Sequence, residues 1–301
     1  MDSENGDTKH VPVLLAEAIE GLDLAPGDIV VDGTAGAGGH AEEILKKISP
    51  SGKLIAIDRD NEAILRVEKK LGRFGNALIC VNDNFRNIGS ILKTLSISAV
   101  NGVLLDLGMS SYQLDDAQRG FSFSKEGPLD MRYNVEQELS ASDIINRADK
   151  YDLEKILREY GEERHAKLLA QKIVEERKKI KISTTAQLSK LIIDSIGRKY
   201  YNQRLNPAAR TFQALRIFTN DELGSLEYGL ENIINSLASG GRICVIDFHS
   251  LEDKIVKNIF HKMKTSGILQ CINKKPIVPA YEEVRSNPRA RSAKLRIGEK
   301  I

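Results

Sequence analysis

A glycine-rich turn between an apolar run and a helix-like segment constrains this chain most. The run Ile29-Val30-Val31 ends in Asp32 and opens into four glycines within the seven residues 33–39. Residues 41–47, which follow, have the composition of a helix. A strand, a tight glycine turn and a helix in this order are typical of doubly wound sheets, where the turn lets backbone N–H groups approach a bound nucleotide. The segment therefore predicts an α/β sheet with a nucleotide site.

A second apolar run, residues 54–57, ends in Asp58. An acidic residue about 20 positions after the glycines, at a strand end, is where a ribose diol is usually held, because a carboxylate accepts two hydrogen bonds from adjacent hydroxyls. A cap on the helix that begins near Asn61 is the alternative role of Asp58.

The charge at the first strand end distinguishes between cofactors. Asp32 would repel the pyrophosphate of a dinucleotide, and the spacing Gly36-Ala37-Gly38-Gly39 departs from the dinucleotide pattern. The same carboxylate favours a cationic ligand, such as the ammonium and sulfonium groups of S-adenosylmethionine. S-adenosylmethionine is therefore the predicted cofactor, with NAD as the alternative.

Composition places the chain among ordinary globular proteins. Of its 301 residues, 41% are hydrophobic and 29% are charged, and the length allows one large or two modest domains. No apolar run approaches the roughly 18 residues that span a bilayer, and residues 1–10 are polar, which predicts a cytoplasmic protein with no membrane association. The five histidines show no metal-ligand spacing, so no metal site is expected.

Basic residues are concentrated in three segments although the net charge is only +2. Residues 164–182 hold seven Lys or Arg against two Glu, residues 198–216 hold five and no acid, and residues 285–300 hold six against one Glu. Clusters of this kind indicate a polyanionic partner such as RNA. Where both signs alternate, as in residues 175–179, a solvated helix face is the alternative.

Apolar runs and helical segments alternate along both ends of the chain. The runs expected to be strands are 29–31, 54–57, 77–81, 103–107 and 243–246, with weaker ones at 268–272 and 293–297. Such alternation predicts a parallel sheet with right-handed crossovers. The last two runs lack a clear helix between them and predict a hairpin at the sheet edge.

The gap between the fourth and fifth strands is too long for one crossover. Its segments 141–146, 152–160, 163–178 and 185–196 are helical in pattern. We therefore expect two domains, a discontinuous sheet domain (1–111 and 217–301) and a mainly helical insertion (112–216) that recognises the substrate.

Asp106 ends the fourth strand, which should lie beside the first strand at the switch point of the sheet. Enzymes that methylate exocyclic amines of bases place an Asp or Asn there, because its oxygen accepts a hydrogen bond from the amine and orients the nitrogen. The residues after it, Leu107-Gly108, lack the two prolines usual at this point. A turn-forming role ahead of Gly108 is the alternative.

The three cysteines, Cys80, Cys244 and Cys271, lie inside strand-like runs and are expected in the core. This argues against methylation of carbon 5 of cytosine, which needs an accessible thiolate, and favours a nitrogen or oxygen nucleophile.

Several blocks, in order along nearly the whole chain, carry a family resemblance. They are His10 to Leu15, Asp32 to His40, Ala56 to Asp60, Leu104 to Asp116, Arg119 to Phe123, Gly127 to Arg132, Tyr160 to Arg164, Asn206 to Ile217, Phe248 to Asp253 and Asn287 to Ser292. With these blocks the chain resembles the ribosomal RNA small subunit methyltransferase H (MraW-type) family, which makes N4-methylcytidine in 16S rRNA.

The resemblance implies a Rossmann-like S-adenosylmethionine-dependent methyltransferase sheet and a 16S rRNA substrate on the small ribosomal subunit. It places the cofactor against Gly38, Gly39, His40, Asp58, Phe85, Asp106 and Gln113, in addition to the contacts already expected at Asp32 and Gly36. Asp106 is the expected catalytic residue. A core position is the alternative for Phe85, and a homodimer is left open.

Two further blocks have two interpretations each. Phe121 and Phe123, beside Arg119, could stack on RNA bases or seat the insertion on the core. A helix carrying Arg210, Gln213 and Arg216 could contact phosphate or join the insertion to the sheet.

Around residue 250, Ser250 and Asp253 are predicted to cap a helix, with His249 near the target base. At the level of function, a non-catalytic ribosome-binding protein and an NAD-dependent oxidoreductase remain as alternatives to the methyltransferase.

Overall fold

The structure, a computed structural model, describes residues 12–197 and 206–301. Its contacts divide the chain into two compact units, one made of Met1–Gly108 and Gly224–Ile301 and the other of Met109–Leu223. We call them the sheet unit and the helical unit. No helix among the described residues is long and apolar enough to cross a membrane.

The sheet unit alternates strands and helices in its first part and ends in a hairpin-like pair. Its elements up to the fourth strand are α1 (Leu15–Leu22), β1 (Ile29–Asp32), α2 (Gly39–Ile48), β2 (Lys53–Asp58), α3 (Asn61–Leu71), β3 (Leu78–Asn82), α4 (Ile88–Thr94) and β4 (Val100–Asp106). Those after the helical unit are α11 (Glu222–Ser236), β5 (Leu237–Asp247), α12 (Ser250–Thr265), β6 (Leu269–Cys271), α13 (Tyr281–Ser286) and β7 (Lys294–Lys300). All seven expected strands are present.

The seven strands form one sheet in the order β3-β2-β1-β4-β5-β7-β6. The first five are parallel, whereas β7 runs antiparallel to both β5 and β6. The expected edge hairpin is therefore confirmed as a pairing of β6 with β7, but its connection is long and contains the short helix α13, which the sequence pattern did not indicate.

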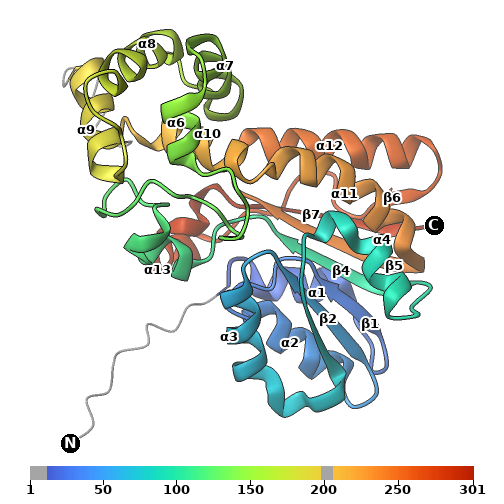
Figure 1. The fold of residues 1–301 in the computed structure, drawn as a ribbon. Helices are drawn as coiled ribbons and strands as arrows, with labels where there is room; N and C mark the ends of the chain where they lie inside the picture. Colours follow the sequence, from blue (N-terminus) through green and yellow to red (C-terminus); the bar gives the residue numbers. More distant parts are fainter. Residues whose placement is uncertain (1–11, 198–205) are drawn as a thin grey trace, which may run out of the picture. The chain divides into compact units, whose positions relative to one another are not determined.

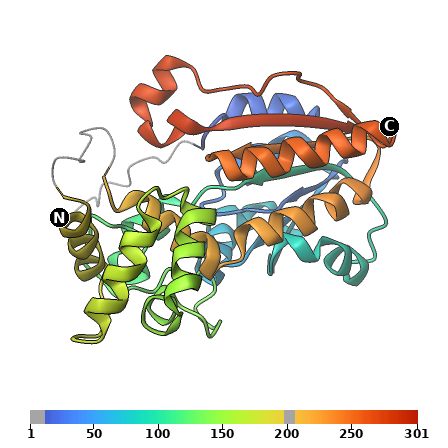
Figure 2. The same ribbon diagram turned by 90° about the horizontal axis from the view of Figure 1, so that it is seen from above.

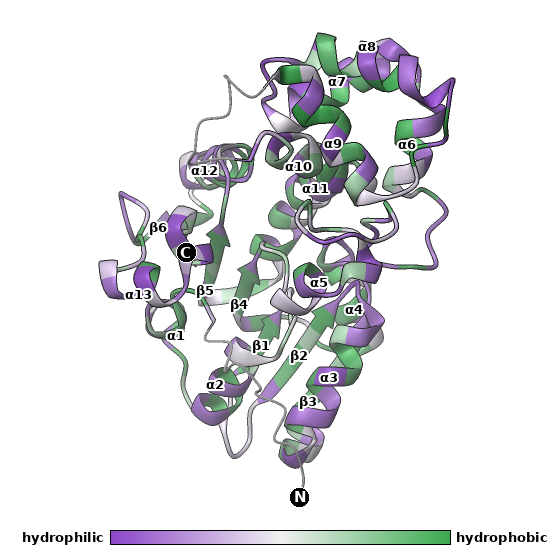
Figure 3. Ribbon diagram, turned by 90° about the vertical axis from the view of Figure 1, so that its left-hand side faces the viewer, coloured by the Kyte–Doolittle hydropathy of each residue, from purple (hydrophilic) through white to green (hydrophobic). Residues whose placement is uncertain are grey.

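Helices cover both faces of this sheet (Figures 1 and 2). One core cluster joins α1, α2 and α3 to strand residues such as Val30 and Leu104, and a second joins α4, α11 and α12 to Val31 and Leu105. Successive strand residues thus enter opposite cores, which explains the continuous apolar runs in the sequence. Figure 3 shows these central strands as predominantly hydrophobic.

The helical unit has a core of its own. Its helices are α5 (Ser111–Asp115), α6 (Ala141–Arg147), α7 (Lys150–Gly161), α8 (Ala166–Arg177), α9 (Thr185–Ile196) and α10 (Ala209–Thr219). Capping boxes begin α6 at Ser140 and α9 at Thr184, where each N-cap side chain accepts a backbone N–H and is matched by a reciprocal bond. These caps explain why the two helices begin where they do.

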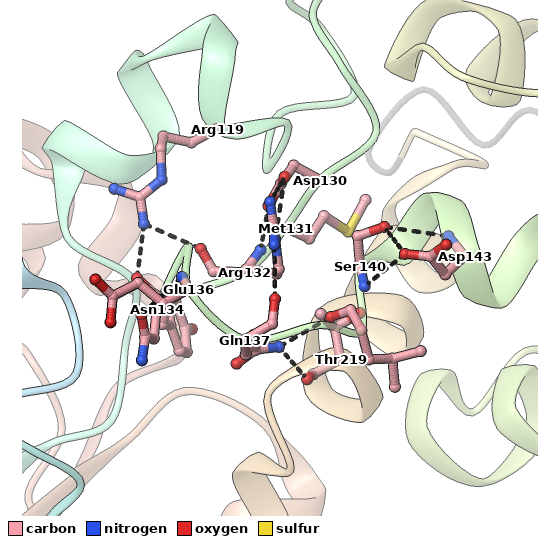
Figure 4. A network of polar contacts seen from close by, with 12 residues as sticks. Arg119, Asp130, Met131, Arg132, Asn134, Glu136, Gln137, Ser140, Asp143 and Thr219 are labelled. Atoms are coloured by element: carbon pink, nitrogen blue, oxygen red, sulfur yellow. Dashed lines mark hydrogen bonds and ion pairs between the residues drawn. The ribbon is translucent and has the colours of Figure 1, made fainter.

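A polar network holds the long loop before α6 (Figure 4). Arg132 makes a bidentate ion pair with Asp130 and donates to the Gln137 carbonyl at 2.6 Å. Arg119 donates to the carbonyls of Arg132 and Tyr133 at 3.0 and 2.9 Å. The loop therefore takes a defined path without secondary structure of its own.

Candidate active site

Three acidic residues end three neighbouring strands of the sheet unit. Asp58, Asp32 and Asp106 are the last residues of β2, β1 and β4, which lie side by side in this order. In the parallel register Asp32 pairs with Ala56 on one side and Leu104 on the other. Asp58 and Asp106 therefore each extend two residues beyond Asp32, and the three carboxyl groups belong to one edge of the sheet.

The glycine turn after β1 has the backbone that the sequence predicted. Gly36 and Gly38 have φ angles of 49° and 71°, in the left-handed region that favours glycine. At Gly39, a Cβ atom would lie 2.2 Å from Pro12 Cγ, so only glycine fits. Helix α2 begins here without a side-chain cap, which leaves the first backbone N–H groups directed at the turn.

Asp58 ties the turn to the next loop. Its Oδ2 accepts a hydrogen bond from the Gly36 N–H at 2.8 Å and its Oδ1 accepts one from the Asp60 N–H at 2.9 Å. Burial raises the pKa of Asp58 to about 6 despite these bonds. The helix-cap alternative for Asp58 is wrong, because the side chain that caps α3 is Asp60, which accepts from the Glu62 N–H.

Asp32 is buried, with 2% of its surface exposed. Its Oδ1 accepts a bond of 3.2 Å from the Thr34 N–H. Burial raises its pKa to about 7, and the charge of Asp58 adds to the shift.

Asp106 lies next to His40. The His40 Nδ1 atom is 3.7 Å from Asp106 Oδ2, and the Asp106 backbone N–H donates to Thr34 Oγ1 at 2.6 Å. Among the described residues no hydrogen-bond partner reaches Asp106 Oδ1, which is buried. Burial and the nearby charge of Asp32 raise the pKa of Asp106 to about 7.

The Gly108 N–H, two residues after Asp106, opposes the rise in the pKa of this carboxyl group. Gly108 itself packs against the Phe248 ring, where a Cβ atom would lie 2.8 Å from a ring carbon. A side chain at position 108 would therefore collide with Phe248 directly after Asp106.

Two of the expected cofactor residues, Phe85 and Gln113, have contacts within their own units. Phe85 is half-buried after β3; its ring packs against Gly229 of α11 beside the second core cluster, and its Cβ lies 3.1 Å from the place of a Cβ atom on Gly33 in the glycine turn. Gln113 belongs to the helical unit, where its Oε1 accepts from the Ser110 N–H at 3.2 Å and completes the capping box of α5.

The cap predicted at Ser250 is wrong by one residue. His249 is the N-cap of α12, its Nδ1 accepts from the Glu252 N–H, and Glu252 Oε2 accepts in return from the His249 N–H. Asp253 instead forms ion pairs with Lys294 and Arg296 of β7. The prediction counted only the usual cap residues, whereas an imidazole nitrogen can accept the same bond.

A fourth strand-end acid escaped the sequence analysis. Asp247 ends β5, is fully buried, and neither carboxylate oxygen has a hydrogen-bond partner among the described residues. Burial and the charges of Asp253 and Glu252 raise its pKa to about 8. The signal was present, because Asp247 follows an apolar run as Asp32, Asp58 and Asp106 do.

All three cysteines lie in strands, but the predicted core position is confirmed only for Cys244, since Cys80 and Cys271 are half-buried at the outer strands β3 and β6. Burial raises the pKa of the Cys80 thiol to about 11 and also raises that of Cys244. Both thiols therefore stay protonated at neutral pH.

In the helical unit, the two candidate RNA-stacking rings pack within the unit itself. Phe121 is 4% exposed and stacks on Tyr133, while Phe123 is half-buried and meets Phe212 edge to face. Both rings contact the core of the helical unit, which disfavours Phe121 as a surface for RNA bases.

The polar side chains of α10 also serve the unit itself. Arg210 donates to the Glu162 carbonyl, Gln213 donates to the Tyr160 carbonyl, and Arg216 forms a bidentate pair with Glu222. The remaining cations of the 198–216 cluster, Arg198, Lys199 and Arg204, lie outside the described residues.

Strand order, strand direction and the acid-lined sheet edge together define the class. A 3-2-1-4-5-7-6 sheet with an antiparallel β7 is the Rossmann-like arrangement of S-adenosylmethionine-dependent methyltransferases. The chain belongs to the MraW methylase family, whose model matches residues 7–301. This membership decides against the NAD-dependent oxidoreductase.

Named relatives match over nearly their whole length. The chain is 46% identical to "Ribosomal RNA small subunit methyltransferase H" of Halothermothrix orenii and 47% identical to the protein of that name from Caldicellulosiruptor bescii, in both cases over 97% of this chain and 99% of the relative. A solved structure described as a putative rRNA methylase from Clostridium thermocellum aligns over 97% of this chain and all of its own, at 13% identity and a TM-score of 0.48.

Proposed function

We propose that this protein transfers a methyl group from S-adenosylmethionine to the exocyclic N4 amine of a cytidine in 16S rRNA of the small ribosomal subunit. The observation that carries the proposal is the pair of neighbouring carboxyl groups, the buried Asp32 and the partly buried Asp106, both with a pKa near 7. Two acids that repel each other, and that form no ion pair with a Lys or Arg of the described residues, are suited to a positively charged ligand.

The residues of the sheet unit fit this cofactor. Asp32 and Asp106 offer negative charge to its cationic groups, and Asp58 offers carboxylate oxygens to its ribose. Gly36 and Gly38 shape the turn, and the start of α2 at Gly39 and His40 offers backbone N–H groups to its carboxylate. The group supplies an electrophilic methyl on a positively charged sulfur. Phe85 next to the adenine and Gln113 as a further contact remain predictions from the family resemblance.

Asp106 has the chemistry for the reacting amine. Its buried Oδ1 has no partner among the described residues and is available to accept an N–H of the target base. The lone pair of an exocyclic amine is delocalised into the ring, so a fixed acceptor contributes mainly by orienting the nitrogen. As the nitrogen is methylated it becomes strongly acidic, and Asp106 takes up its proton. His40, 3.7 Å from the other oxygen, is a positioning residue for this carboxylate.

The proposed substrate class, small-subunit ribosomal RNA, rests on the names of the relatives, which are ribosomal RNA small subunit methyltransferases. N4 of cytidine rests on the family resemblance and on the high thiol pKa of Cys80 and Cys244, which disfavours attack at carbon 5 by either residue.

The test is to incubate the protein with labelled S-adenosylmethionine and small ribosomal subunits from cells that lack the gene. Nucleoside mass spectrometry should find one new N4-methylcytidine in 16S rRNA. Label on another base or position would overturn the N4 assignment. Tight binding of subunits without any transfer would instead indicate a non-catalytic ribosome-binding protein.

A further inference from the structure

A basic groove lies on the outer surface of the helical unit. It has a volume of about 460 Å³ and is lined by residues of α7 and the start of α8. Four of its lining residues are cations, namely Lys150, Lys155, Arg158 and Lys167. A volume of this size lies within the range of small-molecule sites and suits a single nucleotide unit.

The pattern of α7 explains how the groove forms. Leu153, Ile156 and Leu157 are buried in the core of the helical unit. Tyr151 and Arg158, at helical spacing on the opposite face, are exposed. Figure 3 shows the resulting alternation of hydrophobic and hydrophilic residues on α7 and α8.

Tyr151 is the aromatic side chain of this groove. It is 78% exposed, and the Lys150 ammonium lies 5.9 Å from its ring centroid. Phe121 and Phe123, the rings that the sequence suggested for stacking, pack against the core of the helical unit, Phe121 buried and Phe123 half-buried. A cation, Arg119, also lies 5.9 Å from the Phe121 ring centroid, so the feature that distinguishes Tyr151 is its exposed ring.

The charges of the groove are positive on balance. Two acids line it, and one of them, Glu154, is already engaged in an ion pair with Arg158. The charge of the other acid, Glu159, is outweighed by those of the three remaining cations, Lys150, Lys155 and Lys167. A groove with an exposed ring and surplus cations is complementary to a base and its phosphate, because rings stack on any base and lysines neutralise phosphates.

We propose that this groove binds a nucleotide of single-stranded RNA, with a base stacked on Tyr151 and the flanking phosphates held by Lys150, Lys155 and Lys167. The inference rests on the proposed RNA substrate and extends it to a contact surface. An acidic protein segment would satisfy the lysines but would leave the ring without a stacking partner.

The test measures RNA binding without any methyl transfer. A labelled single-stranded RNA of about 12 nucleotides, within the size range that such surfaces cover, is titrated with the full-length protein and followed by fluorescence anisotropy. Tyr151→Ala should weaken binding about 5- to 100-fold, and Tyr151→Phe should restore most of it. Lys155→Ala should reduce the slope of log affinity against log salt by about 0.7.

Matched controls come from the sheet unit. Tyr228 is 61% exposed with the Arg86 guanidinium 5.4 Å from its ring centroid, and Lys46 is an exposed lysine paired with Glu43. Tyr228→Ala and Lys46→Ala should bind RNA as the wild type does. Equal affinity for Tyr151→Ala and Tyr228→Ala would overturn the proposal, and so would polyglutamate competing as well as RNA.

The failure of this inference is distinguishable from that of the proposed function. If wild-type protein methylates small subunits and Tyr151→Ala does so with the same KM, the groove is not an RNA contact although the function stands. If the inference is right, Tyr151→Ala raises the KM for subunits and leaves kcat and the affinity for S-adenosylmethionine unchanged.

Discussion

The two units differ in where their polar side chains are placed. In the sheet unit, the strand-end residues Asp32, Asp58 and Asp106 are buried or half-buried, and their pKa values lie above the ordinary range. In the helical unit, conspicuous polar groups such as Arg132 and Arg216 satisfy neighbours within the same unit. Acids with raised pKa values are costly to the fold when they ionise, so their placement is better explained by a ligand than by stability.

The largest expected effect concerns Asp106. Asp106→Ala should lower kcat for methyl transfer by about 10²- to 10⁴-fold, because the oriented acceptor and the proton sink are both lost. The affinity for S-adenosylmethionine, measured by calorimetry, should fall much less.

Asp247→Ala is the matched control, since Asp247 is another strand-end acid of the same sheet but has no assigned role. A similar loss of kcat in both variants would show that the effect is a general consequence of removing a buried charge.

The next largest effect is the difference in unfolding free energy between variants of a core ring and of a surface ring in the helical unit. Phe121→Ala should lower the free energy of unfolding by about 3–5 kcal/mol, because Phe121 is buried against Tyr133. Tyr151→Ala should change it by less than about 0.5 kcal/mol. Denaturant titration of both variants checks this, and equal destabilisation would contradict the contrast drawn between the two rings.

A smaller effect is expected at Asp32. Asp32→Asn should weaken S-adenosylmethionine binding by about 30-fold or more, because the variant cannot form the buried charge pair between this carboxylate and the cation of the cofactor. Thr34→Ala is a control that removes a neighbouring hydroxyl and no charge. If calorimetry gave wild-type affinity for Asp32→Asn, the cofactor's positive charge would have to be met elsewhere.

The smallest effect is a gain in stability. The pKa of Asp32 is about 7 in the folded protein against an ordinary value of 3.8, so the folded state binds the proton more tightly. The contribution of Asp32 to the free energy of unfolding is therefore lost as pH rises from about 4 to 7, and it remains absent above pH 7. Asp32→Asn, which cannot ionise, should raise Tm at pH 8 by about 2–4 °C for each kcal/mol of relief, and by less at pH 4.5. A larger gain at pH 4.5 would reverse the assigned direction.

Much of the sheet unit could be predicted from the sequence because its signals are local. Each parallel strand is an apolar run that ends in a polar residue, and glycines mark the turn at Gly36 to Gly39.

The identity of the α12 cap was missed because it depends on one imidazole nitrogen. The partner of Asp253 was missed because Lys294 and Arg296 are distant in sequence and meet it only through β7.

The helical unit was harder to predict for a physical reason. Phe121, Phe123 and Tyr151 are all aromatic residues near basic ones, and which of them is exposed depends on the packing of several helices. The hydrophobic spacing of α7 contains part of this information, since Leu153 and Leu157 lie on the face opposite Tyr151. The role of the Arg119 and Arg132 network in shaping the loop could not be read from spacing at all.

The central claim is that the two neighbouring carboxyl groups of Asp32 and Asp106 receive a positively charged methyl donor. Calorimetric titration with S-adenosylmethionine and S-adenosylhomocysteine between pH 6 and 8.5, in buffers of different ionisation enthalpy, tests it directly. A bound cation favours the carboxylate forms of Asp32 and Asp106, so binding of the methyl donor should release protons below about pH 7, and its affinity should rise with pH and level off near pH 8. S-adenosylhomocysteine, with one positive charge fewer, should show a shallower dependence. Affinities that are independent of pH and the same for both ligands would contradict the account.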